Sequence, residues 1–408
     1  MAAAGADATI ERMVDPDRAG VAAVRDPWQD LTFRAKGLVQ QAVEPIGRWV
    51  DTMSSTPRPF EDWMVWFWHD HFATAIEKVK SPQYMIGQLR TLRRLGLATF
   101  PELLKALTID AAMLVWLDGR ESTRTAPNEN YGREVLELFA LGIGNYTEAD
   151  VQAGARALTG WTVAKKALPG AGALAARAAT PRFTAYRHDP RPQAYLGHDG
   201  VHDVDTVVAA ICAQPACARF VAAKLVHAVI GEVDDPVIDD VARQFSASGL
   251  DLRVLARAVL HAAVDQHQSG RAQPVVAAPV PWLAGAQRAT GARLSHLQAV
   301  GLLRAAGQLP MDPPSVGGWP TGPAWLGTST ATARYQMAGL VASATAPGHP
   351  ARTAAARDDV AALATALGRP EGFSAPTMAS VRAAQGAGGA PGVAALTMAL
   401  VSPDLVLA

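Results

Sequence analysis

Most of the chain follows a helical pattern, because apolar residues recur every three or four positions rather than at every second one. The pattern runs from Phe60 to about Leu117 and returns in the segments 205–212, 216–229, 236–246, 250–263 and 294–307. No stretch sustains the strict apolar–polar alternation of a half-buried strand. We therefore predict an all-α protein, a large irregular helical bundle with long loops and no substantial sheet.

Changes in composition along the chain suggest its organisation. Residues 1–58 are rich in alanine and charge, with prolines that interrupt the pattern, and we expect an N-terminal extension with short helices. Residues 59–345 form the expected helical core domain. The Ala/Gly-rich residues 346–408 are expected to be a helical tail that packs on this core, and the similarly biased residues 164–180 a surface insertion.

A polar stripe interrupts the apolar pattern at residues 128–142, NENYGREVLELFALG. On a helix, Asn130, Glu134 and Glu137 share one face, because residues three or four apart are neighbours. Two carboxylates on one helical face can ligate a metal ion, as in helical bundles. They can equally form ion pairs with Arg133, Arg156, Arg187 or Lys224, and Arg133 lies four residues before Glu137. Both interpretations stay open at this point.

A second helix start follows the stripe. Thr147 is a suitable N-cap with Asp150 three residues later, and Gly160 can supply the left-handed residue after the helix. The string NENYGREVLELFALGIGNYTEADVQAGARALTGW resembles the signature of the bacterial family catalogued as domain of unknown function 1800. The resemblance extends to FWHDHF (67–72), RHD (187–189), LG (196–197), KL (224–225) and GGWPTGPAW (317–325).

This resemblance implies a mainly helical fold but no reaction, because the activity of the family is not established. It also implies a partner that resembles a sulfatase or an alkaline phosphatase, since such proteins are frequent gene neighbours. Many relatives are exported, whereas this sequence shows no basic region followed by an apolar one near its start. We therefore expect a cytoplasmic protein as the sequence is written, and export if a leader is missing.

His69 and His71 flank Asp70 in the segment FWHDHF, an order that resembles a metal ligand set. Residues two apart on a helix point to nearly opposite faces, so both can reach one ion only where the helix ends or distorts. The alternative is that each histidine packs in an aromatic core. We name His69, His71, Glu134 and Glu137 as candidate ligands of a divalent transition metal.

Arg187, His188 and Asp189 lie on a proline-rich, irregular segment and are candidates for acid–base catalysis together with Glu134. They can instead anchor the loop through buried hydrogen bonds. Trp319 and Trp325, on a glycine-rich loop, are suited either to stacking on a saccharide or to packing against the core.

Composition excludes several classes of protein. Acidic and basic residues balance at 37 each, which gives no general attraction to nucleic acid, and no apolar run reaches the length of a membrane span. Motifs for phosphate loops, dinucleotide binding, serine-hydrolase elbows and HExxH zinc sites are missing. The two cysteines, Cys212 and Cys217, are expected to be a reduced, partly buried pair, with a disulfide as the alternative.

Two hypotheses for function follow. The first is a metal-assisted helical enzyme, a hydrolase or an oxidase, that acts on a small organic molecule or a saccharide at a site shared by FWHDHF, the polar stripe and the RHD loop. The second is a non-catalytic helical scaffold or a module that binds a carbohydrate or a partner, in which the same residues form a buried salt-bridge network.

Overall fold

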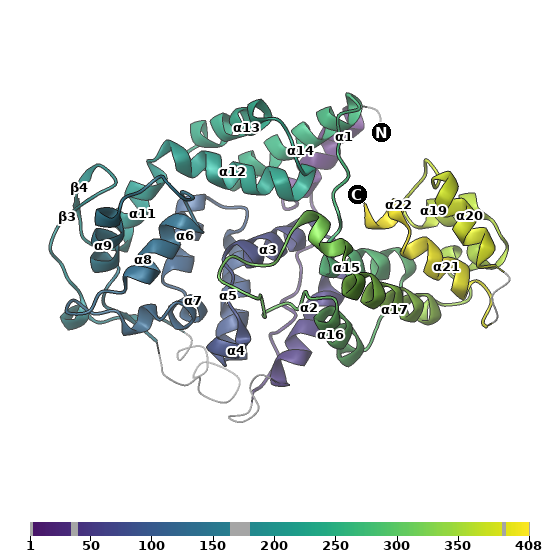
Figure 1. Cartoon of the computed structure of the whole chain (residues 1–408), viewed down its shortest axis with the longest axis horizontal. Helices are drawn as coiled ribbons and strands as arrows, with labels where there is room; N and C mark the ends of the chain where they lie inside the picture. Colours follow the sequence, from purple (N-terminus) through teal and green to yellow (C-terminus); the bar gives the residue numbers. More distant parts are fainter. Residues whose placement is uncertain (1–2, 34–39, 164–179, 386–388, 408) are drawn as a thin grey trace. The chain divides into compact units, whose positions relative to one another are not determined.

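The computed structural model describes residues 3–33, 40–163, 180–385 and 389–407 (Figure 1). Its elements are mainly helices, so the predicted all-α class is confirmed. The insertion expected at residues 164–180 lies almost entirely outside the described residues. In the described part of the chain no single helix is long and apolar enough to cross a membrane, while one bent pair, Val204–Cys212 with Pro215–Ile230, meets the criteria of length and composition together.

The described chain divides into two compact units, each built from three separate segments. Unit 1 comprises residues 1–42, 60–273 and 311–318, and unit 2 comprises residues 43–59, 274–310 and 319–408. This division rests on backbone contacts, whereas the boundaries predicted after residues 58 and 345 rest on composition. The predicted division into residues 1–58, 59–345 and 346–408 therefore stays a prediction.

Unit 1 contains most of the helices and all of the strands. Its helices are α1 (Ala3–Val14), η1 (Gln40–Ala42), α3 (Pro59–His71, from Phe60 onward), α4 (Ile76–Val79), α5 (Pro82–Leu95), α6 (Phe100–Thr108), α7 (Ala111–Trp116), η2 (Gly119–Glu121), α8 (Glu129–Glu137), α9 (Glu148–Ala157), η3 (Ala185–Arg187), α11 (Val204–Cys212), α12 (Pro215–Ile230), α13 (Asp235–Ala247) and α14 (Leu252–Gln268). Two antiparallel pairs of short strands complete it: β1 (Trp161–Thr162) with β2 (Arg182–Phe183), and β3 (Gln193–Tyr195) with β4 (His198–Val201).

The named elements of unit 2 are all helices in its described residues, which also hold one isolated β-bridge, between Val276 and Leu407. Its elements are α2 (Val43–Ser55), α15 (Pro279–Thr290), α16 (His296–Ala305), η4 (Gly322–Leu326), α17 (Thr328–Ala344), α18 (Pro350–Ala356), α19 (Val360–Ala366), α20 (Ala375–Ala383), α21 (Val393–Leu400) and α22 (Pro403–Val406). Helix α2 packs against α15 and α16, and α17 packs against α21.

Helix α3 of unit 1 is buried on nearly every side, because most of its residues are apolar. Trp68 is fully buried, and its indole Nε1–H donates a hydrogen bond to the carbonyl oxygen of Gly96 over 2.9 Å. The ring of Trp68 also packs on Phe72 and Phe100. A helix buried all round, as the sequence predicts, carries its few polar residues into the core, where each needs a partner.

The helix start predicted at Thr147 is also present. Thr147 and Asp150 form a capping box at α9, and Thr99 and Glu102 form another at α6, which satisfies backbone N–H groups of the first turn. Gly160 follows α9 with φ of +96°, and a side chain there would lie 2.8 Å from the Cβ atom of His188. Glycine at this position therefore permits both the backbone conformation and the close approach of the RHD segment.

Candidate functional site

The end of α3 brings Asp70 and His71 against two other segments of unit 1. The backbone of Gly318 lies directly on Asp70: a Cβ atom at residue 318 would be 2.2 Å from the carboxylate Oδ1 and 2.6 Å from the carbonyl oxygen of Asp70. Gly318 has φ of +86°, which L-residues rarely adopt. Glycine is thus required at this position of the GGWP segment for two reasons: the backbone has a positive φ, and a side chain would collide with Asp70.

His71 connects α3 with the C-terminal part of the polar stripe. Its Nε2 lies 2.9 Å from the carbonyl oxygen of Phe139, and because a carbonyl only accepts, Nε2 carries the hydrogen. The ring also packs against those of Phe72, Phe139 and Phe220. The remaining ring nitrogen, Nδ1, is buried and has no hydrogen-bond partner among the described residues. In the neutral ring this nitrogen is an acceptor.

Burial lowers the pKa of His71 well below its usual value, and the nearby ammonium of Lys224 lowers it further. The hydrogen bond to Phe139 acts in the opposite direction but is weaker. His71 is therefore neutral throughout the physiological range, with its lone pair on Nδ1.

Lys224 comes from α12 and completes this group. Its Nζ lies 5.2 Å from the centre of the Phe220 ring, a cation–π distance. The side chain is half-buried and makes no hydrogen bond or ion pair in the parts of the chain that the structure describes. Desolvation lowers the pKa of its amine, and the charge of Asp70 opposes this shift.

The ring of Phe220 in turn packs against Gly142, near the end of the polar stripe. Gly142, with φ of +76°, leaves room for it, since a Cβ atom there would lie 2.9 Å from the Phe220 ring. Parts of four segments that carry the family resemblance therefore lie together here. They are FWHDHF (67–72), LFALG (138–142), KL (224–225) with the preceding turn of α12, and the glycines at 317–318. We refer to Asp70, His71 and Lys224 as the lysine site.

His69 has a different environment from His71. It is fully buried, and its Nε2 accepts the backbone N–H of Met311 over 2.9 Å. Burial lowers its pKa to about 3, so the ring is neutral. The hydrogen bond occupies the lone pair of Nε2 and fixes residue 311 on α3. His69 and His71 thus bind separate backbone segments, as their near-opposite directions on the helix predict.

The carboxylates of the polar stripe are half-buried on α8. Burial, and then the charge of Glu137, raise the pKa of Glu134. Glu137 accepts a short hydrogen bond from the hydroxyl of Tyr146. Arg133 does not pair with Glu137 as a salt bridge; its guanidinium forms a two-pronged pair with Glu148, at 2.6 and 2.7 Å. These contacts join α8 to the loop and helix that follow it.

The RHD segment is held to the end of α9. His188 lies with Nδ1 3.0 Å from the carbonyl oxygen of Thr159, and the backbone N–H of Asp189 donates to the hydroxyl of Thr159 over 2.8 Å. The carboxylate of Asp189 pairs through both oxygens with Arg191, at 2.8 and 2.6 Å. Arg187 donates to the carbonyl oxygen of Arg120 over 2.8 Å. These contacts match the loop-anchoring alternative.

The described residues contain no group of three or more His, Cys, Asp or Glu side chains placed to hold a metal ion. The predicted ligands His69, His71, Glu134 and Glu137 therefore receive no support as a set from this geometry. Their assignment as metal ligands, and that of Glu134, Arg187, His188 and Asp189 as catalytic residues, stays a prediction.

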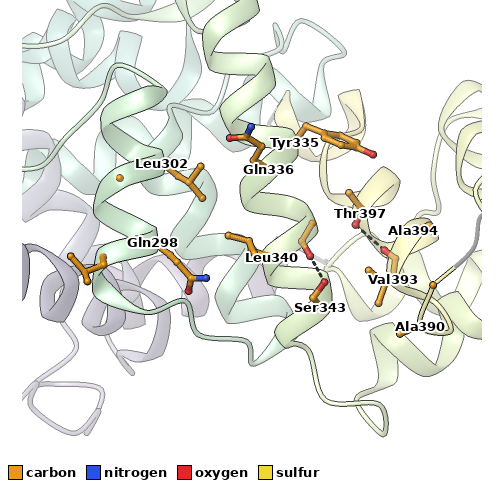
Figure 2. A pocket seen from close by; sticks show the side chains of 14 residues that line it. Gln298, Leu302, Tyr335, Gln336, Leu340, Ser343, Ala390, Val393, Ala394 and Thr397 are labelled. Carbon is orange, nitrogen blue, oxygen red and sulfur yellow. Dashed lines mark hydrogen bonds between the residues drawn. The ribbon is translucent and has the colours of Figure 1, made fainter.

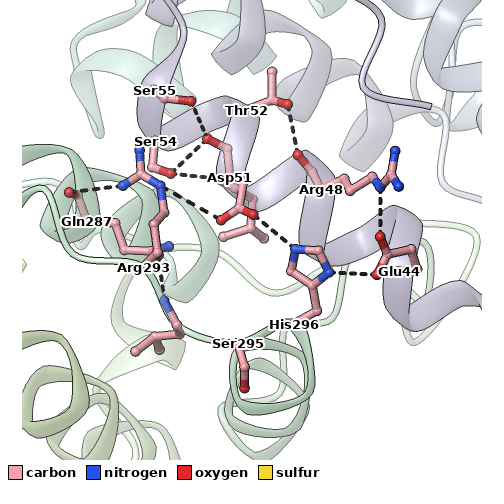
Figure 3. Close-up of polar contacts among 12 residues, drawn as sticks. Glu44, Arg48, Asp51, Thr52, Ser54, Ser55, Gln287, Arg293, Ser295 and His296 are labelled. Atoms are coloured by element: carbon pink, nitrogen blue, oxygen red, sulfur yellow. Dashed lines mark hydrogen bonds and ion pairs between the residues drawn. The ribbon is translucent and has the colours of Figure 1, made fainter. Parts of the chain in front are cut away.

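Unit 2 holds a second cluster of charge, centred on His296 (Figure 3). The ring nitrogens lie 2.8 Å from a carboxylate oxygen of Glu44 and 2.9 Å from one of Asp51. Because carboxylates only accept, both nitrogens donate and the ring is an imidazolium. Burial lowers its pKa, but the hydrogen bonds to Asp51 and Glu44 prevail and the net pKa is raised. Arg48 and Arg293 pair with the same two carboxylates.

Unit 2 also contains an open groove of about 790 Å³ between α16, α17 and α21 (Figure 2). Its fourteen lining residues include no charged side chain. Tyr335 is 55% exposed and Leu297 is 75% exposed, while Gln298 and Gln336 supply amides. This lining suits a neutral ligand with both apolar and polar surface.

Two of these features escaped the sequence reasoning. From the sequence, Lys224 is only part of the resemblance and one of several possible ion-pair partners of the stripe carboxylates, although it is a lysine within an otherwise apolar helix, VAAKLV. The His296 cluster has a weak signal in α2, where Glu44 and Asp51 lie seven apart on one face with Gly47 between them. The partner of that face is remote in sequence, so no local pattern could indicate it.

The comparisons agree with the resemblance seen in the sequence. A family model described as "Protein of unknown function (DUF1800)" matches residues 1–407, essentially the whole chain. No curated protein and no solved structure matches the chain.

Proposed function

The chain belongs to the DUF1800 family, and we propose that it is an enzyme that acts on a polar organic substrate at the lysine site. The observation that carries this proposal is the state of Lys224. Its half-buried ammonium forms no hydrogen bond or ion pair among the described residues, and the charge of Asp70 does not outweigh its desolvation. Burying a charge without a hydrogen-bonded partner is unfavourable. Such groups are common where a ligand supplies the missing partner.

His71 indicates a second group that the substrate must present. Its buried Nδ1 lacks a donor in the described chain, while Lys224 lacks an acceptor. A substrate that satisfies both presents a carbonyl or carboxylate oxygen beside a hydroxyl or amine hydrogen, as in a hydroxy or amino acid. In this arrangement Lys224 stabilises negative charge on the substrate oxygen, and the neutral Nδ1 of His71 accepts a hydrogen bond from the substrate hydroxyl or amine.

The first test measures the ionisation of Lys224 directly. Reductive methylation with ¹³C-formaldehyde labels the lysines, and the NMR signal of each is followed against pH. We expect the signal that disappears in Lys224→Met to titrate below the others, because its amine is desolvated. A Lys224 signal that titrates together with those of exposed lysines contradicts the proposal.

The second test concerns ligands. A panel of hydroxy acids, amino acids and their simple esters is screened by thermal shift against the native protein, Lys224→Met and the control Lys105→Met. Lys105 is exposed and pairs with Asp205, so its replacement leaves the lysine site intact. We expect a stabilising ligand to act on the native protein and the control but not on Lys224→Met. Equal shifts in all three proteins argue against the site.

A second candidate function is the binding of a neutral saccharide in the groove of unit 2. The observation that favours it is the uncharged lining together with the exposed ring of Tyr335 and the amides of Gln298 and Gln336. Sugars stack on aromatic rings and bond to amides. Calorimetry with neutral oligosaccharides tests it: binding that is lost in Tyr335→Ala supports this function, and no heat from any neutral sugar rejects it.

A further inference from the structure

Cys212 and Cys217 lie on either side of a tight turn in unit 1. Cys212 is the last residue of α11, and Cys217 lies in the first turn of α12. The turn is fixed by backbone hydrogen bonds of 3.0 Å from Gln214 N–H to Ile211 and from Cys217 N–H to Gln214. The two helices are bent by 78° across it. Both thiols are free, and the turn places them near enough to each other for Cys212 to shift the pKa of Cys217.

The two thiols differ in their access to solvent. Cys217 is completely buried, whereas Cys212 is partly exposed. Contact with Cys212, and then burial, raise the pKa of the Cys217 thiol well above its usual value. A solute therefore reaches Cys212 first, and Cys217 is a protected thiol next to it.

We propose that Cys212 and Cys217 are a redox-active dithiol that a hydroperoxide converts into an intramolecular disulfide. The hydrogen-bonded turn holds the two cysteines, five residues apart, at the adjoining ends of α11 and α12, so that rotation of the side chains can bring the sulfur atoms to bonding distance. These are also the only two cysteines in the chain. No third thiol within the chain competes for the intermediate.

The reaction balances in two steps. The sulfur of Cys212, as the thiolate, attacks one oxygen of the hydroperoxide; the O–O bond breaks, and the other oxygen leaves as water or alcohol after taking a proton. The sulfur of Cys217 then attacks the Cys212 sulfenic acid, the S–O bond breaks, and water leaves with the thiol proton of Cys217. In total, two thiols and one hydroperoxide give one disulfide and two molecules of water or water and alcohol.

The proposed disulfide would restrain the first turns of α12, which carry two residues of the lysine site region. Phe220 and Lys224 lie three and seven residues after Cys217, so all three residues fall on one face of the helix. A covalent link from Cys217 to α11 would restrain the helix that carries them. The chemistry of the dithiol itself does not depend on the function proposed for Lys224.

The test uses the full-length protein and hydrogen peroxide. Thiols are counted with Ellman's reagent after denaturation, and the intact mass is recorded. We expect two thiols before treatment, none after it, a mass lower by two hydrogens, and full recovery with dithiothreitol. A mass raised by added oxygen, disulfide-linked dimers, or two thiols that persist at peroxide levels that oxidise free cysteine would overturn the proposal.

Single variants separate the roles of the two residues. In Cys217→Ser, dimedone is expected to trap a sulfenic acid at Cys212, because no second thiol resolves it. In Cys212→Ser, Cys217 is expected to stay reduced and unlabelled while the protein is folded. Equal labelling of Cys217 in that variant contradicts the assignment. Circular dichroism confirms folding, and Cys217→Ala replaces Cys217→Ser if the buried hydroxyl disrupts the core.

Discussion

The imidazole of His296 occupies the space above Gly47, so closely that a Cβ atom at residue 47 would lie 2.2 Å from Cγ of the ring. Glu44 and Asp51 lie one turn before and one turn after this glycine and hold the ring from both sides. Gly47 thus creates the recess in α2 that lets α16 approach with a charged residue at its first position.

Gly47→Ala is expected to destabilise the protein by about 1–3 kcal/mol, because the added methyl group forces the His296 ring out of its recess. The matched control is Gly301→Ala in α16, where a Cβ atom meets nothing within 4 Å. Alanine is a better helix former than glycine, so the control is expected to be neutral or stabilising. Urea denaturation measures both, and a Gly47→Ala variant as stable as the control would contradict the packing described.

His296 is expected to make stability depend on pH. Its pKa is raised in the folded protein, so its stabilising contribution is complete below the unfolded value near 6.5 and declines as the pH rises through the folded pKa. The stability difference between the native protein and His296→Gln should therefore be larger at pH 6 than at pH 9. His198→Gln, on the exposed hairpin, is the control. A difference that grows with pH would reverse the sign and refute the imidazolium assignment.

Asp110 is also expected to make the protein less stable as the pH rises, but for a different reason. Burial raises its pKa to about 7, although the backbone N–H groups of Met113 and Ala112 and the amide of Gln88 oppose this. Between about pH 4 and 7 the folded form keeps a proton that the unfolded form has lost, so stability falls as the pH rises, by at most roughly 1.4 kcal/mol per pH unit. Asp110→Asn keeps the capping oxygen and should remove this fall, which denaturation at pH 4.5 and 7.5 can measure.

Thr159→Val tests whether the RHD segment is anchored by α9. The hydroxyl of Thr159 accepts the N–H of Asp189 and is fully buried, so its loss leaves a buried donor without a partner. We expect a loss of about 1–3 kcal/mol. Thr125→Val, whose exposed hydroxyl contacts only that of Thr123, is expected to change stability by less than about 0.5 kcal/mol. Similar melts for both variants would show that the anchor is unimportant.

Glu134→Gln and Glu137→Gln should differ in their thermal melts at pH 7. Glu134 is partly desolvated and repelled by Glu137, so a neutral side chain there should cost nothing. The charge of Glu137 strengthens the hydrogen bond from Tyr146, so glutamine there should lose about 1 kcal/mol. A large loss for Glu134→Gln alone would show that its charge, rather than that of Glu137, supports the fold.

The fold class and the helix start at Thr147 could be predicted from the sequence because their causes are local. The capping box of Thr147 and Asp150 and the all-round apolar pattern of α3 each lie within one turn or one helix. The divergence of His69 and His71 follows from helix geometry alone. In each of these cases, residues a few positions apart determine the structure.

The candidate site depends on contacts between distant segments, so the sequence could not assign roles to its residues. His71 bonds to Phe139, and Asp70 meets Gly318, over separations that no local pattern encodes. Likewise Arg133 has Glu137 at a suitable spacing on its own helix, yet it pairs with Glu148 because α9 returns alongside α8. Side-chain types indicated candidates, while tertiary packing selected the partners.

The two compact units are each assembled from segments far apart in the chain, and this affects how the protein is made. Unit 1 needs Met311–Gly318, and unit 2 needs residues 43–59. During translation the ribosome must therefore release nearly four-fifths of the chain before the first unit can close, and the early segment of the second must wait longer still. Until then the side of α3 that meets residues 311–318 stays uncovered, so nascent chains should depend on chaperones, and neither unit can be expressed alone by a simple cut.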